Sequence, residues 1–295
     1  MMIKRDLNSI WLGIKVLFFL LLYMSGMSDF DRLSLATDLM QKCQIQKTLK
    51  IGFADEEPFA YVDQQGNLTG EAVVVALHVF KKLGVERLEG ISTEFGSLIP
   101  GLKAGRFDMI AAGMYITPKR CKEVCFSNPT YKLGESFLVQ SGNPKDLHSY
   151  KDLMKDNIIV GITAGSVESQ YLRLYNIPES RIKIYPSPPL AARAVLTGKI
   201  DALAAPSLTV NRIAQKLPGV EPVDSFVQPK VKGKTIIGYG AFAFRKEDSD
   251  FVKRINKELK IFIGTKEHLK LVSSFGFDNQ NIPDKTANEL CDRKW

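Results

Sequence analysis

A pattern of eight residues occurs twice in the chain and limits the folds that the chain can adopt. The segments Gly105–Ala112 (GRFDMIAA) and Gly198–Ala205 (GKIDALAA) each place a basic residue, an apolar residue and an aspartate between a glycine and an apolar run. The glycine is typical of a helix end, and the apolar run is typical of a buried strand. The copies lie 93 residues apart, which is too long for a solenoid and fits one small α/β lobe. The pattern predicts two related lobes, with chance similarity as the alternative.

Short apolar runs alternate with helical patterns along most of the chain. In the first half, strands are expected at 50–54 and 107–112, and the helices between them end at Gly84 and Gly105. The same order returns over residues 158–205. This alternation predicts an α/β fold in which helices cover mainly parallel sheets.

The chain is expected to pass between the two lobes twice. The run ESFLVQSGNP (135–144) leads out of the first half, and IIGYGAFAFRK (236–246) leads back. We therefore expect residues 49–141 and 239–295 to form the first lobe and residues 142–238 to form the second. Two connecting strands make a hinge, so a cleft between the lobes can close on a ligand.

The amino terminus differs from the rest of the chain. Lys4, Arg5 and Lys15 precede the apolar run Val16–Met24, which has the length of a signal-peptide core. We expect residues 1–26 to be a signal peptide that directs export to the periplasm or the cell exterior; a retained membrane anchor is the alternative. Residues 27–48 are an amino-terminal extension without an assigned role.

Charge and cysteine content limit the partners. The net charge is +8, but no run of five basic residues occurs, so we expect no nucleic-acid partner. The histidines are not spaced as metal ligands from a cysteine pair, so neither a metal nor another cofactor is expected. Cys121 and Cys125 are four residues apart, and we expect them to share a helix face. Four cysteines in an exported chain allow three disulfide pairings.

Several polar and aromatic residues follow the expected strands, where α/β proteins bind ligands. Gly113 permits close approach, Thr117 offers a hydroxyl group and an N–H group, and Arg120 has a planar guanidinium suited to a carboxylate. Together they predict an anion site, although an arginine of purely structural role is the alternative. Ser166 opens a helix in the second half and adds further N–H donors.

A second group of residues predicts a site for a cation. Glu56 and Glu57 follow the first strand, and aromatic residues lie in the same kind of loop: Phe59, Tyr61, Phe95 and Tyr115. Aromatic faces around a carboxylate favour a flat or delocalised cation. The whole inventory therefore fits a zwitterion, with its anionic end on Arg120 and its cationic end on a glutamate.

Longer runs carry a family resemblance, and they cover about Lys50 to Cys291. The chain resembles the polar amino-acid family of bacterial extracellular solute-binding proteins in these runs: PFAYVDQQGNLTGEA, FGSLIPGLKAGRFDMIAAGM, ITPKR, FSNPTY and GKIDALAA. GFADEEPFAY and GNPKDLHSY are similar to its ectoine- and hydroxyectoine-binding members. The resemblance implies the two-lobed, type II periplasmic-binding-protein fold and, from cysteines that recur together in such relatives, a disulfide between Cys121 and Cys291. Cys43 is the competing partner.

The resemblance also implies roles for single residues. Glu56 would pair with the ligand's amidinium, and Phe59, Phe95 and Tyr115 would enclose its ring. The carboxylate would be held by Arg120, Gly113, Thr117 and Ser166. We expect a monomer that carries ectoine or hydroxyectoine to a membrane ABC permease and catalyses no reaction. The alternatives are a binding protein for a polar or basic amino acid and a dehydratase that uses Glu56 as an acid or base.

Overall fold

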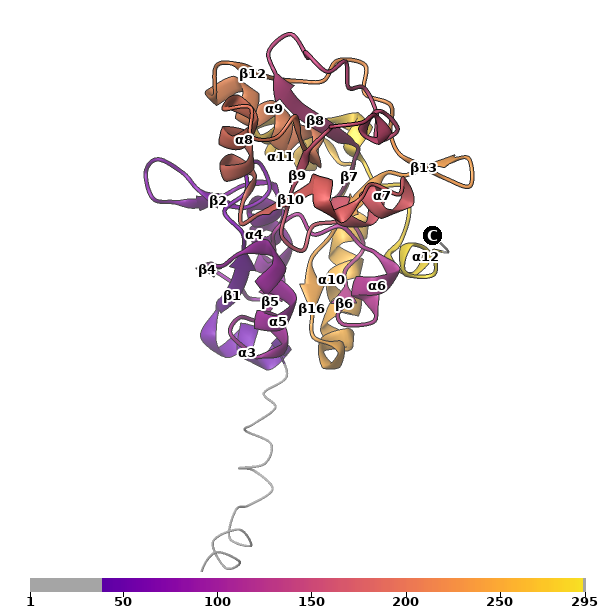
Figure 1. The fold of residues 1–295 in the computed structure, drawn as a ribbon. Helices are drawn as coiled ribbons and strands as arrows, with labels where there is room; N and C mark the ends of the chain where they lie inside the picture. Colours follow the sequence, from indigo (N-terminus) through magenta and orange to yellow (C-terminus); the bar gives the residue numbers. More distant parts are fainter. Residues whose placement is uncertain (1–38, 294–295) are drawn as a thin grey trace, which may run out of the picture.

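The computed structural model describes residues 39–293 and has two lobes, each built on a five-stranded sheet (Figure 1). The second lobe lies above the first in this view. The expected signal peptide, residues 1–26, lies outside the described part of the chain. Among residues 39–293, no helix combines the length and apolar character needed to cross a bilayer.

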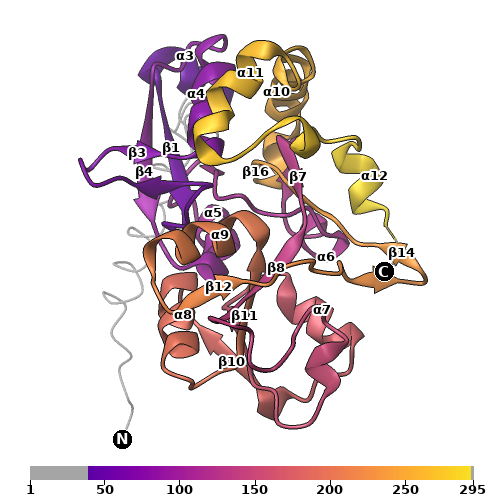
Figure 2. The same ribbon diagram turned by 90° about the horizontal axis from the view of Figure 1, so that it is seen from above.

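The first lobe has a mixed sheet. Its strands, in spatial order, are β4 (Arg87–Ser92), β1 (Thr48–Phe53), β5 (Met109–Ile110), β16 (Ala243–Phe244) and β6 (Cys125–Phe126). The first three are parallel, and β16 is antiparallel to both of its neighbours. The helices of this lobe are α3 (Leu39–Gln46), α4 (Glu71–Lys81), α5 (Leu98–Lys103), α6 (Pro118–Cys121), α10 (Ser249–Phe262), α11 (Lys266–Val272) and α12 (Ala287–Cys291). Figure 2 shows α4, α10 and α11 packed together.

The second lobe repeats this arrangement. Its strands, in spatial order, are β10 (Ile182–Tyr185), β9 (Val160–Thr163), β11 (Ala202–Pro206), β8 (Glu135–Gln140) and β12 (Val220–Pro222). Its helices are α7 (Glu168–Leu174), α8 (Pro188–Leu196) and α9 (Ser207–Lys216). The face of α8 with Ala191, Ala192 and Val195 is buried against the sheet and forms part of the core of this lobe.

The repeated pattern has the same structural role in both lobes. Gly105 and Gly198 adopt positive φ angles of 71° and 68°, which glycine tolerates at a helix end. The Asp108 carboxylate accepts the Lys50 N–H group at 2.9 Å, and the Asp201 carboxylate accepts the Ile159 N–H group at 2.7 Å. Asp108 and Asp201 directly precede β5 and β11, the central strands of their sheets, so each hydrogen bond fixes the chain where its central strand begins.

Two antiparallel strands connect the lobes: β7 (Tyr131–Leu133) leads out of the first, and β15 (Gly238–Gly240) leads back. The expected first boundary, after residue 141, differs from the sheet pairing. β8 pairs with β11 and β12 of the second sheet, so the second lobe begins near Gly134. Two hairpins complete the strands: β2 (Tyr61–Val62) with β3 (Leu68–Thr69), and β13 (Lys230–Val231) with β14 (Lys234–Thr235).

The described end of the amino-terminal extension belongs to the first lobe. Leu39 and Cys43 of α3 are buried, and Lys42 Nζ lies 2.7 Å from the buried carboxylate of Asp108. This contact gives the buried carboxylate a counter-charge in addition to its hydrogen bond from Lys50. The extension therefore completes the lobe rather than standing apart from it.

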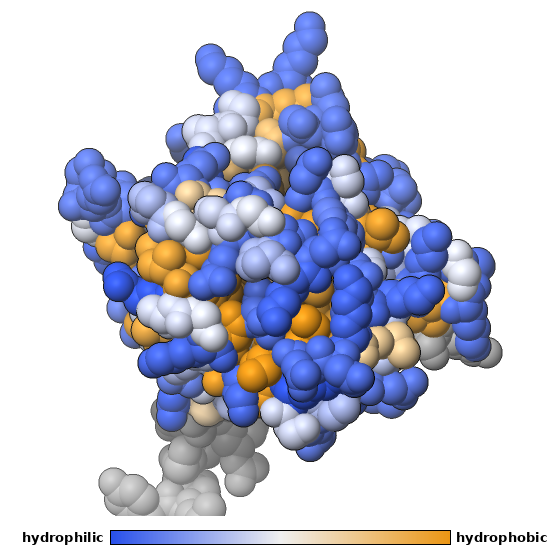
Figure 3. All heavy atoms as spheres, turned by 45° about the horizontal axis from the view of Figure 1, so that its top comes forward, coloured by the Kyte–Doolittle hydropathy of each residue, from blue (hydrophilic) through white to orange (hydrophobic). Residues whose placement is uncertain are grey.

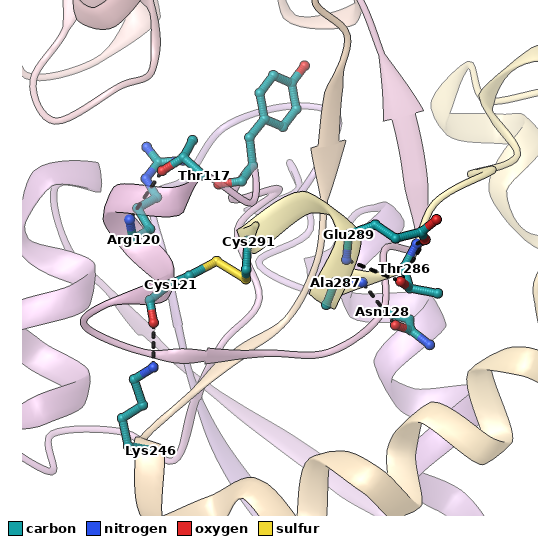
Figure 4. The surroundings of a disulfide bond; sticks show 10 residues. Thr117, Arg120, Cys121, Asn128, Lys246, Thr286, Ala287, Glu289 and Cys291 are labelled. Carbon is teal, nitrogen blue, oxygen red and sulfur yellow. Dashed lines mark hydrogen bonds between the residues drawn. A yellow bond between two sulfur atoms is a disulfide. The ribbon is translucent and has the colours of Figure 1, made fainter. Parts of the chain in front are cut away.

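The carboxy-terminal helix is attached to α6 by a disulfide between Cys121 and Cys291 (Figure 4). The Thr286 and Glu289 side chains cap α12, and the Asn128 side chain accepts the Ala287 N–H group at 3.1 Å. Cys43 takes no part in the bond. The expectation that Cys121 and Cys125 share a helix face is wrong, because α6 ends at Cys121 and Cys125 begins β6.

Candidate functional site

A cavity lies between the lobes, at the carboxyl ends of β1, β5, β9 and β11. Apart from Thr117, every residue to which the resemblance gives a role lines it, whereas the other two candidates, Glu57 and Tyr61, line a neighbouring pocket. The first lobe contributes Glu56, Phe59, Phe95, Ala112, Gly113, Tyr115 and Arg120. The second lobe contributes Thr163, Ser166, Val167, Glu168, Ala204, Ala205 and Pro206.

Arg120 is held in place by its own helix and by both lobes. The Thr117 hydroxyl accepts the Arg120 N–H group at 3.2 Å, so this side chain caps α6 and is absent from the lining. Arg120 Nη1 donates to the Tyr115 carbonyl at 2.7 Å, and Nη2 donates to the Gly165 carbonyl of the second lobe at 3.0 Å. Burial lowers the pKa of Arg120, yet a guanidinium remains charged in proteins. A fixed cation therefore faces the cavity.

Phe95 forms one wall beside this cation. The Arg120 guanidinium carbon lies 5.3 Å from the centre of the Phe95 ring, which is within cation–π distance. The 3₁₀ turn that carries this ring, Phe95–Ser97, begins α5 of the first lobe.

Phe59 and Tyr115 form the other aromatic walls. Gly113 has φ 64°, and a Cβ atom there would lie 2.4 Å from Cγ of Phe59, so only glycine lets this ring take its position. Phe59 stacks on Tyr131 at 5.4 Å between ring centres. The Tyr115 hydroxyl is buried and has no hydrogen-bond partner among residues 39–293. It is therefore a polar atom available to a ligand.

Glu56, rather than Glu57, faces the cavity. The Glu56 Oε1 atom accepts the hydroxyl of Thr209, on α9 of the second lobe, at 2.7 Å. Removal from bulk water raises the pKa of Glu56 to about 7, and the Thr209 hydrogen bond opposes this shift. Glu57 instead forms an ion pair with Lys216 at 2.6 Å. The sequence did not indicate Thr209, because nothing in residues 205–209 (APSLT) predicts that the Thr209 hydroxyl reaches across the cleft.

The second lobe supplies one acidic residue that was not predicted. Glu168, the first residue of α7, lines the cavity with 2% of its surface exposed. Glu135, at the start of β8, lies behind it and is also buried. Burial, and then the adjacent Glu168 carboxylate, raises the pKa of Glu135 well above its ordinary value. The sequence feature that could have indicated Glu168 is its position two residues after Ser166, which was itself predicted for the site.

The lobes contact each other around the cavity. Besides the contacts of Arg120 and Glu56, Arg212 Nη2 donates to the Ser274 carbonyl at 2.7 Å. A Cβ atom on Gly165 would lie 2.6 Å from the Cα atom of Gly96, so the two backbones touch directly. The cavity is thus closed on several sides by contacts between lobes.

Residues 49–277 match the family described as "Bacterial extracellular solute-binding proteins, family 3". The chain belongs to this family. It is 38% identical over 257 residues to the probable amino-acid ABC transporter periplasmic-binding protein y4tE of Sinorhizobium fredii (strain NBRC 101917 / NGR234), with 85% of each chain covered. It is 25% identical over 228 residues to the lysine/arginine/ornithine-binding periplasmic protein of Escherichia coli (strain K12), covering 76% of this chain and 86% of that one.

A solved structure agrees with this assignment. The crystal structure of EhuB in complex with hydroxyectoine is similar to this fold with a TM-score of 0.78 and 31% identity, covering 86% of this chain and 98% of that one. The fold is therefore the type II solute-binding fold. The relatives are solute-binding proteins of ABC transporters, which bind small molecules for a permease, and not enzymes. The dehydratase alternative is set aside accordingly.

Proposed function

We propose that this solute-binding protein captures ectoine or hydroxyectoine outside the cytoplasmic membrane and presents it, as a monomer, to an ABC permease. The observation that carries the proposal is the presence of a buried guanidinium and a carboxyl group in one aromatic cavity, because Arg120 and Glu56 both line it. A ligand with both an anionic and a cationic group matches this arrangement.

The anionic end of the ligand is assigned to Arg120, Gly113 and Ser166. Arg120 donates to the Tyr115 carbonyl of its own lobe, a contact that does not depend on closure, so less side-chain entropy is lost on binding. Ser166 lies in the loop that precedes α7 and brings a hydroxyl group from the second lobe. A carboxylate held here would join the two lobes. Thr117 takes part through the position that it gives to Arg120.

The cationic end is assigned to Glu56 between aromatic rings. Phe59, Phe95 and Tyr115 line the same cavity, and such rings attract a flat, delocalised cation such as an amidinium. The hydroxyectoine complex of EhuB, at 31% identity, supports a ligand of this kind.

A basic amino acid is the second candidate. The relative from E. coli binds lysine, arginine and ornithine by its name, and Glu168 gives this cavity a further acidic side chain. Like ectoine and hydroxyectoine, arginine combines a carboxylate with a planar delocalised cation.

The test is a ligand panel measured by thermal shift and calorimetry on the protein without residues 1–26. The panel contains ectoine, hydroxyectoine, arginine, lysine, histidine, glutamine, glycine betaine and proline. We expect the largest stabilisation from ectoine or hydroxyectoine and loss of binding in Arg120→Ala. If an amino acid alone stabilises the protein, the compatible-solute assignment is wrong and the second candidate takes its place.

A further inference from the structure

Glu168 is a buried acidic group that the ligand assignments above do not use. Its side chain lines, from the second lobe, the same cavity that Glu56 lines from the first. With 2% of its surface exposed, it has almost no contact with bulk water. A carboxylate in such a position is costly unless a cation or hydrogen-bond donors compensate it.

The surrounding protein compensates Glu168 incompletely. Within residues 39–293, no ion pair is formed by this side chain, and its Oε2 atom accepts no hydrogen bond. The Arg120 guanidinium is the nearby cation, but it directs Nη1 and Nη2 to backbone carbonyls. Burial raises the pKa of Glu168, and the groups that favour its ionised form, the Ser166 and Glu135 side chains, its own backbone N–H group and Arg120, offset this only in part.

A purely structural role for Glu168 at the start of α7 does not explain its burial, its place in the cavity lining or its unpartnered oxygen. An acidic residue in the first turn of a helix is favourable, typically by about 0.3–1 kcal/mol when exposed. That benefit does not require burial, and it does not require a place in the lining of a cavity. Glu168 has both, together with an oxygen atom that lacks a partner.

The charges around the cavity are also unequal. One fixed cation, Arg120, shares the lining of the cavity with the side chains of Glu56 and Glu168. A bound carboxylate would occupy Arg120 and leave both glutamates for the rest of the ligand. Because they come from different lobes, a cation between them would offset their mutual repulsion and favour closure.

We propose that Glu168 is a specificity-determining residue: its carboxylate binds the ligand's cationic group from the second lobe while Glu56 binds it from the first. The ligand is therefore an amphoteric molecule whose cation is delocalised and has donors on two sides, such as an amidinium or a guanidinium. Ligands of the same shape without the positive charge are rejected. This inference rests on the proposed function and adds a residue and a selection rule to it.

The experiment compares ligand pairs that differ mainly in charge. Arginine is paired with citrulline, whose urea group replaces the guanidinium, and ectoine is paired with dihydroorotate, a six-membered ring that has a carboxylate and no amidinium. Calorimetry gives the affinity ratio within each pair. We expect the intact protein to prefer the cationic member of at least one pair by about a hundredfold, since a buried charge left unpaired is costly.

The variant Glu168→Gln keeps the shape of the side chain and removes its charge. We expect the preference for the cationic ligand to fall by about tenfold or more, while the neutral partner binds equally well or better. Glu179→Gln changes an exposed glutamate of the same lobe and should leave the ratio unchanged. Glu168→Asp retains the charge and should recover part of the preference. An unchanged ratio in Glu168→Gln overturns the inference.

A separate measurement keeps this inference distinct from the proposed function. If neither hydroxyectoine nor any of these four ligands binds the intact protein, the proposed function is wrong. The inference then depends on the protein alone: Glu168→Gln should melt at a higher temperature than the unaltered protein near pH 8 and at about the same temperature near pH 4.5, because only the ionised carboxylate is costly to bury. Equal melting temperatures at both pH values overturn it.

Discussion

At the scale of single residues, Glu56 shows how burial changes the chemistry of a side chain. Its pKa is raised to about 7, chiefly because it is removed from water, and the Glu168 carboxylate raises it further. At neutral pH the group is therefore close to half protonated before a ligand arrives. A cationic ligand binds the ionised form, so binding and proton release are linked.

This linkage predicts how affinity depends on pH. Below pH 7 a cation must displace a proton from Glu56, so affinity for a cationic ligand should rise from pH 5.5 to pH 7.5, by up to about tenfold per unit. Above about pH 8 the affinity should level off. Calorimetry at several pH values, repeated in buffers of different ionisation enthalpy, measures both the slope and the protons released.

Thr209 provides a matched control for this prediction. Its hydroxyl donates to Glu56 Oε1 and holds the pKa down, so Thr209→Val should raise the pKa and move the midpoint of the profile to higher pH. Glu56→Gln should reduce the slope. A flat profile for the unaltered protein, with no proton release, would contradict the assignment of the cation to Glu56.

Most residues of the candidate site could be predicted because they follow strands, and strand ends meet at one edge of a sheet. Arg120, Phe95 and Ser166 were placed in this way. Thr209 and Glu168 were not, since their positions depend on how the second lobe packs against the first. Thr117 shows a local limit: its hydroxyl has a choice between ligand and helix cap, and the cap hydrogen bond decides the orientation.

At the scale of elements, the disulfide connects the helix that carries Arg120 to the end of the chain. Cys121 is the last residue of α6, and Cys291 is the last residue of α12, 170 positions further on. Figure 4 shows Arg120 on the same short helix as the bond. A four-residue helix has little stability of its own, so this attachment helps to fix the guanidinium.

We therefore predict that Cys121→Ser combined with Cys291→Ser weakens both stability and binding. Opening so long a loop should lower the free energy of unfolding by about 2–5 kcal/mol. Affinity should fall less, by several-fold, because Arg120 keeps its hydrogen bonds to Tyr115 and Gly165. Denaturant unfolding and calorimetry measure the two effects. Cys125→Ser, which leaves the disulfide intact, is the control, and an equal loss in both variants would argue against the role of the bond.

The elements also show what patterns along the chain can determine. The helix ends at Gly105 and Gly198 follow from local conformation, and both were predicted correctly. The sheet to which β8 belongs was not predicted correctly, because an apolar run such as ESFLVQ can pair with strands of either lobe. Its partners, β11 and β12, lie far along the sequence, so the pairing is decided by tertiary structure.

At the scale of the whole molecule, function depends on how closely the lobes approach. The face shown in Figure 3 is mostly hydrophilic, with apolar side chains in separate patches. Polar groups also hold the lobes together, through the Lys216–Glu57 ion pair and the Arg212–Ser274 hydrogen bond. Such contacts are individually weak at a surface, so the closed state is expected to be reversible.

Gly96 gives a direct test of closure, because its backbone touches the second lobe beside the cavity. A Cβ atom at this position would lie 3.3 Å from the Ala164 carbonyl oxygen, so Gly96→Ala is tight and Gly96→Leu obstructs the approach. The φ angle of Gly96 is not positive, so each variant can keep the local fold. We expect affinity to fall in the order glycine, alanine, leucine, with a loss of about tenfold or more for leucine.

Closure and stability can be separated in the same variants. Small-angle scattering with saturating ligand should show a larger radius of gyration for Gly96→Leu than for the unaltered protein, because the lobes stay further apart. The melting temperature without ligand should change little, since Gly96 is exposed and belongs to a turn rather than to a core. If Gly96→Leu binds as tightly as the unaltered protein, the contact between Gly96 and Gly165 is not required for capture. If it lowers the ligand-free melting temperature strongly, the glycine serves the fold of the first lobe instead of the approach of the second.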